Sequence, residues 1–323
     1  MIEFDSVTKA FPDGTTAVED LDLTIPSDGT TVIVGPSGCG KTTTLRMINR
    51  MLDPSSGSIR WDGTDIADVP VTRLRRQMGY VIQSGGLFPH KTVAENIGTV
   101  PRLIGWDARR ISARTGELME LVDLDPALAK RYPAQLSGGQ QQRVGVARAL
   151  AADPVLLLMD EPFSAVDPLV RGDLQQMVKR LNTDLGKTIV LITHDIDEAI
   201  TLGDEVVVMQ RPGHVAQQGT PAQILTEPAN PFVDAFVGKD RGYRALTFLP
   251  AGELDLTPAD GPPPEGARTF PLSGSARVAL DETLLSTDGR AYALDEGGRA
   301  VGMVGVDAIV AAADRQRALI KDS

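Results

Sequence analysis

A glycine-rich segment followed by a lysine and two threonines offers the groups that bind a polyphosphate. The segment Gly35–Thr43 matches the spacing G-x-x-x-x-G-K-[ST]. Its glycines allow backbone N–H groups to approach an anion closely. We expect Lys41 to reach the β- and γ-phosphates of a nucleotide, Thr42 to ligate Mg²⁺ and Thr43 to lie near the α-phosphate. The expected contact residues are Gly35, Pro36, Ser37, Gly38, Cys39, Gly40, Lys41, Thr42 and Thr43.

The sequence around this loop predicts the elements that must position it. Thr30–Val34 is a β-branched run typical of a buried strand, and Thr44–Met51 is typical of a helix. A strand, a glycine turn and a helix N-terminus in this order direct N–H groups and the helix dipole toward an anion. We therefore favour a nucleotide site over a glycine turn with an incidental lysine.

Two adjacent carboxylates follow the continuous apolar run Val155–Met159. Such a run is typical of a parallel strand covered on both faces, and carboxylates at its end are costly unless they are used. We expect Asp160 to hold Mg²⁺ through water and Glu161 to accept a proton from an attacking water as general base. The alternative is a surface turn.

Two more polar side chains follow predicted strands. Gln83 comes after Tyr80–Ile82, and His194 comes after Lys187–Thr193. Ligands bind α/β sheets at the carboxyl ends of strands. Gln83 is therefore a candidate to contact Mg²⁺ or position a water, and His194 is a candidate to sense the γ-phosphate. Each signal is weak alone, because a lone histidine is usually structural.

Residues from about Val93 to Leu150 carry apolar side chains at helical spacing. Within this stretch Leu136-Ser-Gly-Gly-Gln140 directly precedes a predicted helix. A serine and two glycines at a helix N-terminus form a second candidate anion site, and a simple serine N-cap is the alternative. The candidate residues are Ser137, Gly138, Gly139 and Gln140.

The composition limits the partners and the compartment. The chain has 323 residues, of which 42% are hydrophobic, enough for two domains and a sizeable core. A net charge of −11 argues against a dedicated nucleic-acid binder. Cys39 is the only cysteine, which excludes an internal disulfide. We expect a cytoplasmic protein that reaches a membrane only through a partner, because no signal peptide or apolar run of roughly 20 residues is present.

The motifs, in this order, resemble the ATP-binding subunit of an ABC transporter over about residues 1–240. On local grounds Phe11 is either a turn anchor or a ring that stacks on a base. It takes the A-loop position, where this family often has tyrosine, and the resemblance therefore favours stacking on adenine. The motifs are Walker A at 35–43, the Q-loop at Gln83, the signature at 136–140, Walker B through Asp160 and Glu161, the D-loop at Ser164–Asp167 and the H-loop at His194.

The resemblance implies an α/β fold: a P-loop NTPase ABC cassette with a RecA-like core, an antiparallel β subdomain and a helical subdomain at about 87–150. It also implies ATP and Mg²⁺ as ligands and a head-to-tail pair of cassettes. Each ATP would lie between the P-loop of one copy and Ser137–Gln140 of the other, with Asp167 also near the nucleotide. In-line attack by water would be assisted by Lys41, His194 and the opposing signature helix.

The implied partners are a second cassette, an integral membrane permease and, through the permease, an extracytoplasmic solute-binding protein. The resemblance places this chain at the cytoplasmic face of the membrane and implies no nucleic-acid partner. Within the family the chain resembles importers of quaternary amines such as glycine betaine, choline or carnitine, on stretches such as Thr92–Ile97 and Thr193–Ala199. Ser84–Gly85 departs from that pattern near the expected permease contact. The alternatives are another ABC importer or exporter, or a soluble ABC protein.

The C-terminal region, 241–323, changes in character. A proline-rich linker or long loop lies near 258–264. Beyond it we expect strands at Arg290–Leu294 and Val301–Val306 and a helix at Asp307–Arg317. This small α+β region resembles a CBS-type regulatory fragment. Regulation by a ligand and a purely structural or dimerising role both remain open.

Overall fold

The chain forms two units, each with its own core. The computed structural model describes residues 1–83, 86–164, 166–259 and 261–321. The two compact units are Met1–Pro221 and Ala222–Ser323. The predicted boundary at residue 240 falls inside the second unit, and it stays a prediction about where the cassette ends.

A six-stranded sheet carries the strands that end at the candidate site. Its order is β10-β9-β3-β8-β7-β6, with β10 antiparallel to β9 and the other neighbours parallel. The wholly apolar runs in β3 and β7 are buried along their full length, as expected for strands covered on both faces. The strands are β3 (Thr30–Val34), β6 (Met78–Val81), β7 (Leu156–Asp160), β8 (Thr188–Thr193), β9 (Glu205–Gln210) and β10 (His214–Gly219).

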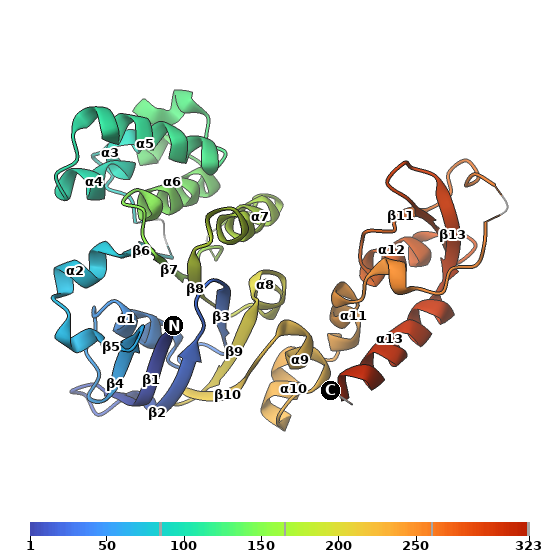
Figure 1. Cartoon of the computed structure of the whole chain (residues 1–323), viewed down its shortest axis with the longest axis horizontal. Coiled ribbons are helices and arrows are strands. Elements are labelled where there is room, and N and C mark those ends of the chain that lie inside the picture. The colour runs from blue at the N-terminus through green and yellow to red at the C-terminus, as the bar shows by residue number, and fades with distance from the viewer. Residues whose placement is uncertain (84–85, 165, 260, 322–323) are drawn as a thin grey trace. The chain divides into compact units, whose positions relative to one another are not determined.

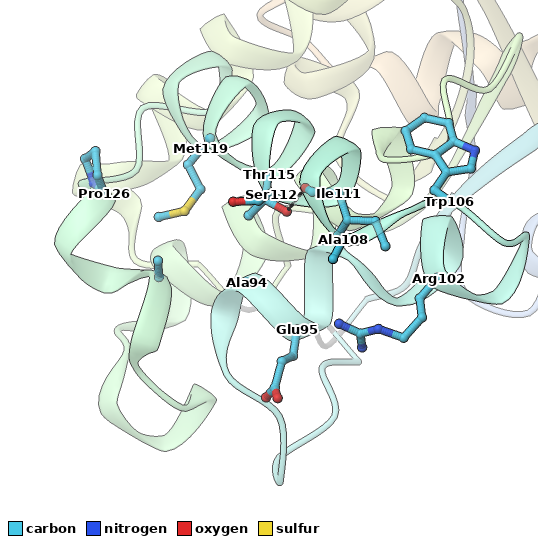
Figure 2. A pocket seen from close by; sticks show the side chains of 12 residues that line it. Ala94, Glu95, Arg102, Trp106, Ala108, Ile111, Ser112, Thr115, Met119 and Pro126 are labelled. Atoms are coloured by element: carbon cyan, nitrogen blue, oxygen red, sulfur yellow. Dashed lines mark hydrogen bonds between the residues drawn. The ribbon is translucent and has the colours of Figure 1, made fainter.

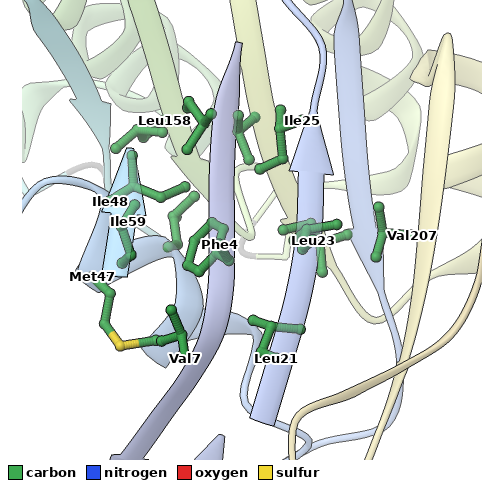
Figure 3. Close-up of a cluster of buried hydrophobic side chains, with 14 of the residues drawn as sticks. Phe4, Val7, Leu21, Leu23, Ile25, Met47, Ile48, Ile59, Leu158 and Val207 are labelled. Carbon is green, nitrogen blue, oxygen red and sulfur yellow. The ribbon is translucent and has the colours of Figure 1, made fainter. Parts of the chain in front are cut away.

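A second sheet of the first unit is antiparallel, in the order β2-β1-β4-β5, which confirms the predicted β subdomain. Figure 3 shows Phe4 of β1, Met47 of α1 (Lys41–Ile48) and Leu158 of β7 in the same buried cluster. The helix after the glycine loop is thus packed against both sheets. The strands are β1 (Ile2–Ala10), β2 (Thr16–Ile25), β4 (Ser56–Trp61) and β5 (Thr64–Asp65).

The predicted helical stretch forms a group of helices at one end of this unit (Figure 1). Three of them begin at a side-chain cap: Thr92 caps α3, Asp107 caps α5 and Ser137 caps α6. The group comprises α3 (Val93–Ile97), α4 (Thr99–Leu103), α5 (Ala108–Leu121) and α6 (Gly138–Leu150), and other helices of the unit are α2 (Val71–Arg76), α7 (Pro168–Leu185) and α8 (Ile196–Leu202).

The second unit is built around a small sheet in the order β11-β12-β13. The two predicted strands and the final helix are present, whereas β11 and α12 were not predicted. The proline-rich segment is a loop inside this unit, irregular in its described residues. The CBS resemblance stays a prediction. The elements are α9 (Pro221–Thr226), α10 (Pro231–Val237), α11 (Arg241–Ala245), β11 (Thr269–Pro271), α12 (Ala276–Leu285), β12 (Arg290–Leu294), β13 (Ala300–Gly305) and α13 (Val306–Lys321).

Within the described ranges, no helix is both long and apolar enough to cross a bilayer.

A buried carboxyl group fixes the end of β8 to α8. Glu198 is only 5% exposed and accepts a hydrogen bond of 2.5 Å from the Thr193 hydroxyl, one residue before His194. Burial raises the pKa of Glu198 above its ordinary value, because a charged carboxylate loses its hydration there. The hydrogen bond fixes the end of β8, but it requires an ionisable carboxyl group to be buried.

We expect Glu198→Gln to gain stability relative to the wild-type chain as pH rises from about 4 to about 7. Well below the ordinary value of 4.5, the wild-type carboxyl is protonated in both the folded and the unfolded chain. At higher pH the unfolded chain ionises first, so the folded wild-type chain is penalised while the neutral glutamine is not. Urea unfolding across this pH range measures the difference, with the exposed Glu117→Gln as the control for losing one charge. A relative stability that falls with rising pH would contradict the raised pKa.

Candidate active site

The glycine loop between β3 and α1 has no room for side chains at its key positions. A Cβ on Gly35 would lie 2.3 Å from the Met209 carbonyl oxygen, and one on Gly40 would lie 2.5 Å from the Ala17 carbonyl oxygen. Such distances are far below a normal contact, so glycine is required at both positions. Gly40 is also the N-cap of α1 and has no side chain to cap it, which leaves the first N–H groups of the helix available to an anion.

Lys41 holds the loop from inside. It is 5% exposed, and its Nζ donates to the carbonyl oxygens of Gly35 at 2.7 Å and Pro36 at 3.1 Å. The Cys39 thiol is fully buried, with Sγ 3.8 Å from the same Nζ. The ammonium group therefore lies at the centre of the loop, where it can meet the charge of a bound phosphate. Ser37 and Gly38 are exposed, and Thr42 and Thr43 are half-buried.

Asp160, at the end of β7, faces the hydroxyl groups of two other elements. The Thr42 hydroxyl donates to Asp160 Oδ1 at 3.3 Å, and the Tyr80 hydroxyl donates to Oδ2 at 3.3 Å. Burial raises the pKa of Asp160 above its ordinary value. Burial and the neighbouring Asp160 carboxylate raise the pKa of Tyr80 to about 12. The sequence does not single out Tyr80 as a site residue, because no sequence pattern links it to Asp160, 80 residues further along the chain.

Glu161 gathers the other strand-end side chains around one oxygen. Its Oε2 accepts a hydrogen bond of 3.2 Å from the Gln83 amide and lies 3.1 Å from His194 Nδ1. Glu161 has a left-handed φ of 44°, which is uncommon for a residue with a side chain and is concentrated at functional sites. Its backbone N–H donates to the Ile192 carbonyl of β8, so the adjacent strand holds the turn. The structure thus brings together Gln83, Glu161 and His194, three side chains that the sequence placed after separate strands.

The signature segment lies in a different part of the unit. Ser137 and Gln140 form a reciprocal capping box that opens α6, and Gly138 is exposed beside them while Gly139 is buried. Figure 1 places α6 in the helical group and α1 beside the antiparallel sheet. The chain thus provides two separate candidate anion sites, one at each helix N-terminus.

The remaining predicted contacts lie at the margins. Phe11 follows β1 and is half-buried, with the Lys9 ammonium 5.6 Å from its ring centroid. Asp167 is exposed just before α7. Ala165 of the D-loop and the pair Ser84–Gly85 lie outside the described residues.

A groove of about 540 Å³ lies among α3, α4 and α5 (Figure 2). Its walls are mostly apolar, and Figure 2 shows Ile111 and Met119 on α5 with Arg102 and Glu95 on the other side. None of its lining residues belongs to the candidate nucleotide contacts. The groove residues are Ala94, Glu95, Arg102, Trp106, Ala108, Ile111, Ser112, Thr115, Gly116, Met119, Pro126 and Ala129.

The donor set at β7 suits a magnesium ion that is shared with a nucleotide. Mg²⁺ prefers oxygen ligands and usually takes one or two from protein, with the rest from water and phosphate. Thr42 and Asp160 supply a hydroxyl and a carboxylate in mutual contact. Over the described ranges, no group of three or more His, Cys, Asp or Glu side chains is placed to bind a metal alone. The residues therefore fit a magnesium–nucleotide complex.

Comparisons with known proteins agree with this geometry. Residues 18–164 match the family model described as ABC transporter. A glycine betaine uptake system ATP-binding protein of Escherichia coli is 56% identical over 249 residues, 77% of this chain and 80% of that protein. A glycine betaine/carnitine/choline transport ATP-binding protein of Bacillus subtilis is 51% identical, and the match covers 75% of this chain and 63% of the relative.

A solved structure shows the same fold. A dimeric ATP-binding cassette in a post-hydrolysis state, bound to ADP and Pi, superimposes with a TM-score of 0.63 at 33% identity and covers 68% of this chain and 99% of that one. The loop, the strand-end carboxylates and these likenesses lead to one conclusion: the chain belongs to the ABC transporter family and is an ATP-hydrolysing cassette.

Proposed function

We propose that this cassette powers the import of a quaternary amine, such as glycine betaine, choline or carnitine, through a separate membrane permease. The observation that supports hydrolysis is the convergence of Gln83 and His194 on the same oxygen of Glu161. The amine substrate rests on the relatives, whose names include glycine betaine, choline and carnitine transport. The cassette contacts the substrate only through its partners, which sit at the membrane.

In this proposal Glu161 is the general base. Its carboxylate accepts a proton from the water that attacks the γ-phosphate, while Gln83 and His194 hold the carboxylate and the water in place. Lys41 stabilises the charge that develops on the phosphate oxygens. A magnesium ion held by Thr42 and Asp160 would neutralise further phosphate charge when bound. ADP and phosphate leave, and the proton passes from Glu161 to solvent.

The second half of the site comes from a second cassette. The P-loop and the Ser137–Gln140 segment of one chain lie in different parts of the first unit. We infer that two chains pair head to tail, so that the N-terminus of α6 in one faces the phosphates bound by α1 in the other. Phe11 would stack on the adenine, and Asp167 would lie at the junction between the chains.

We expect Glu161→Gln to slow ATP turnover by a factor on the order of 10² to 10⁴, because glutamine keeps the shape but cannot accept the proton. ATP binding should be retained. Steady-state phosphate release and equilibrium nucleotide binding on the full chain measure the two quantities. Glu117→Gln is the matched control, since this exposed side chain on α5 pairs with Arg114. Near-normal turnover in Glu161→Gln would disprove the assigned role.

We also propose that the permease docks in the groove among α3, α4 and α5. The groove is apolar inside and carries one cation and one anion, Arg102 and Glu95, at its edge. The same helical group includes α6, which begins with the signature residues. A segment seated in the groove would therefore move together with the part of the cassette that closes on the partner's ATP.

Filling the groove should uncouple the cassette from the permease. Gly116 lines the groove, and a Cβ added there meets nothing within 4 Å, so Gly116→Trp is expected to fold. We expect it to lose co-purification with the permease from detergent-solubilised membranes and to keep the ATPase activity of the isolated chain. Gly172→Trp on α7 is the control, because its Cβ position is equally open and lies outside the groove. Equal recovery of permease with both variants would contradict docking at the groove.

A further inference from the structure

The turn that joins β9 to β10 runs along the outside of the P-loop. The Met209 carbonyl lies beside Gly35, and the Cα of Gly213 lies 3.3 Å from the position of a Cβ on Gly40. Between them, the Arg211 guanidinium lies beside Gly38, where a Cβ would be 2.8 Å from Nη2. Gly38 and Gly40 therefore face this turn, and Gly35 faces the end of β9 just before it, each so closely that an added Cβ would be in contact.

Arg211 makes a specific contact with the loop backbone. Its Nη2 donates to the Ser37 carbonyl oxygen at 2.5 Å, although the side chain as a whole is exposed. Holding an exposed arginine side chain in one geometry costs conformational entropy, and the hydrogen bond to the Ser37 carbonyl must offset that cost. Arg211 lies outside the P-loop motif at 35–43.

Two cations hold three consecutive carbonyl groups of the loop. Lys41 donates hydrogen bonds to the carbonyls of Gly35 and Pro36 from the buried side, and Arg211 donates one to the carbonyl of Ser37 from the exposed side. A peptide group is planar, and in the trans form its C=O and N–H point in opposite directions. Fixing the Ser37 carbonyl toward Arg211 therefore turns the Gly38 N–H away from it.

We propose that Arg211 is a positioning residue for ATP binding. By fixing the Ser37–Gly38 peptide group, it presents the Gly38 N–H to the phosphates before the nucleotide arrives, and its charge adds to the attraction for them. Arg211 acts through the loop, so it alters nucleotide affinity more than the rate of the chemical step, which depends on Glu161. This inference concerns binding of the nucleotide and holds whichever solute is transported.

The test compares Arg211→Ala and Arg211→Lys with Arg75→Ala in the full chain. Arg75 is a matched control: it is exposed and donates to the carbonyls of Asn49 and Arg50, at the other end of α1. Calorimetry with Mg·ADP gives the dissociation constant, and steady-state kinetics give KM and kcat for ATP. The Gly38 amide resonance of ¹⁵N-glycine-labelled protein reports the peptide group directly.

We expect Arg211→Ala to raise the Mg·ADP dissociation constant and the KM for ATP about tenfold, the size of effect expected for one charge-assisted hydrogen bond, while kcat changes less than about threefold. Arg211→Lys should keep part of the wild-type affinity for Mg·ADP, and Arg75→Ala should keep all of it. The Gly38 amide resonance should shift in the Arg211 variants without nucleotide. If Arg211→Ala does not fold, Arg211→Lys and its Gly38 resonance decide the question. Unchanged affinity, or equal losses in the Arg211 and Arg75 variants, would overturn the proposal.

Discussion

The structure depends on the close approach of one backbone loop to its surroundings. At Gly35 and Gly40 the P-loop touches the carbonyls of Met209 and Ala17 so closely that no side chain fits. The loop is therefore held by β9 and β2, from two different sheets, as well as by the strand and helix that it joins. A phosphate site built from backbone N–H groups needs this rigidity, since each donor must already point at the anion.

The positions of the strand-end side chains depend on the order of the strands in the six-stranded sheet. Because β6, β7 and β8 are parallel neighbours, their carboxyl ends meet at one edge, and this brings Gln83, Glu161 and His194 together. Burial raises the pKa of Asp160, because it penalises the charged form of the carboxyl group. The signature segment belongs to a separate helical group, which is why we propose that a second chain completes the reaction site.

The central strands of the cassette could be predicted from the residues, because they are short apolar runs that end in polar side chains, whereas its division into subdomains rested on the family resemblance. The strand at Leu156–Asp160 and its carboxylates are the clearest case. Contacts between distant segments could not be predicted: Tyr80 bonds to Asp160, and Arg211 bonds to Ser37, with no periodicity linking them. In the second unit β11 has three residues, too few to show an alternating pattern.

The most direct test of the composite site is the assembly state of full-length Glu161→Gln with and without nucleotide, measured by light scattering during gel filtration. The account predicts that Mg·ATP increases association over Mg·ADP or no nucleotide, because bound ATP joins the P-loop of one chain to the signature of the other. Adding Ser137→Arg should abolish the ATP-dependent part by crowding the N-terminus of α6. An assembly state that is the same with ATP, with ADP and without nucleotide would contradict the account.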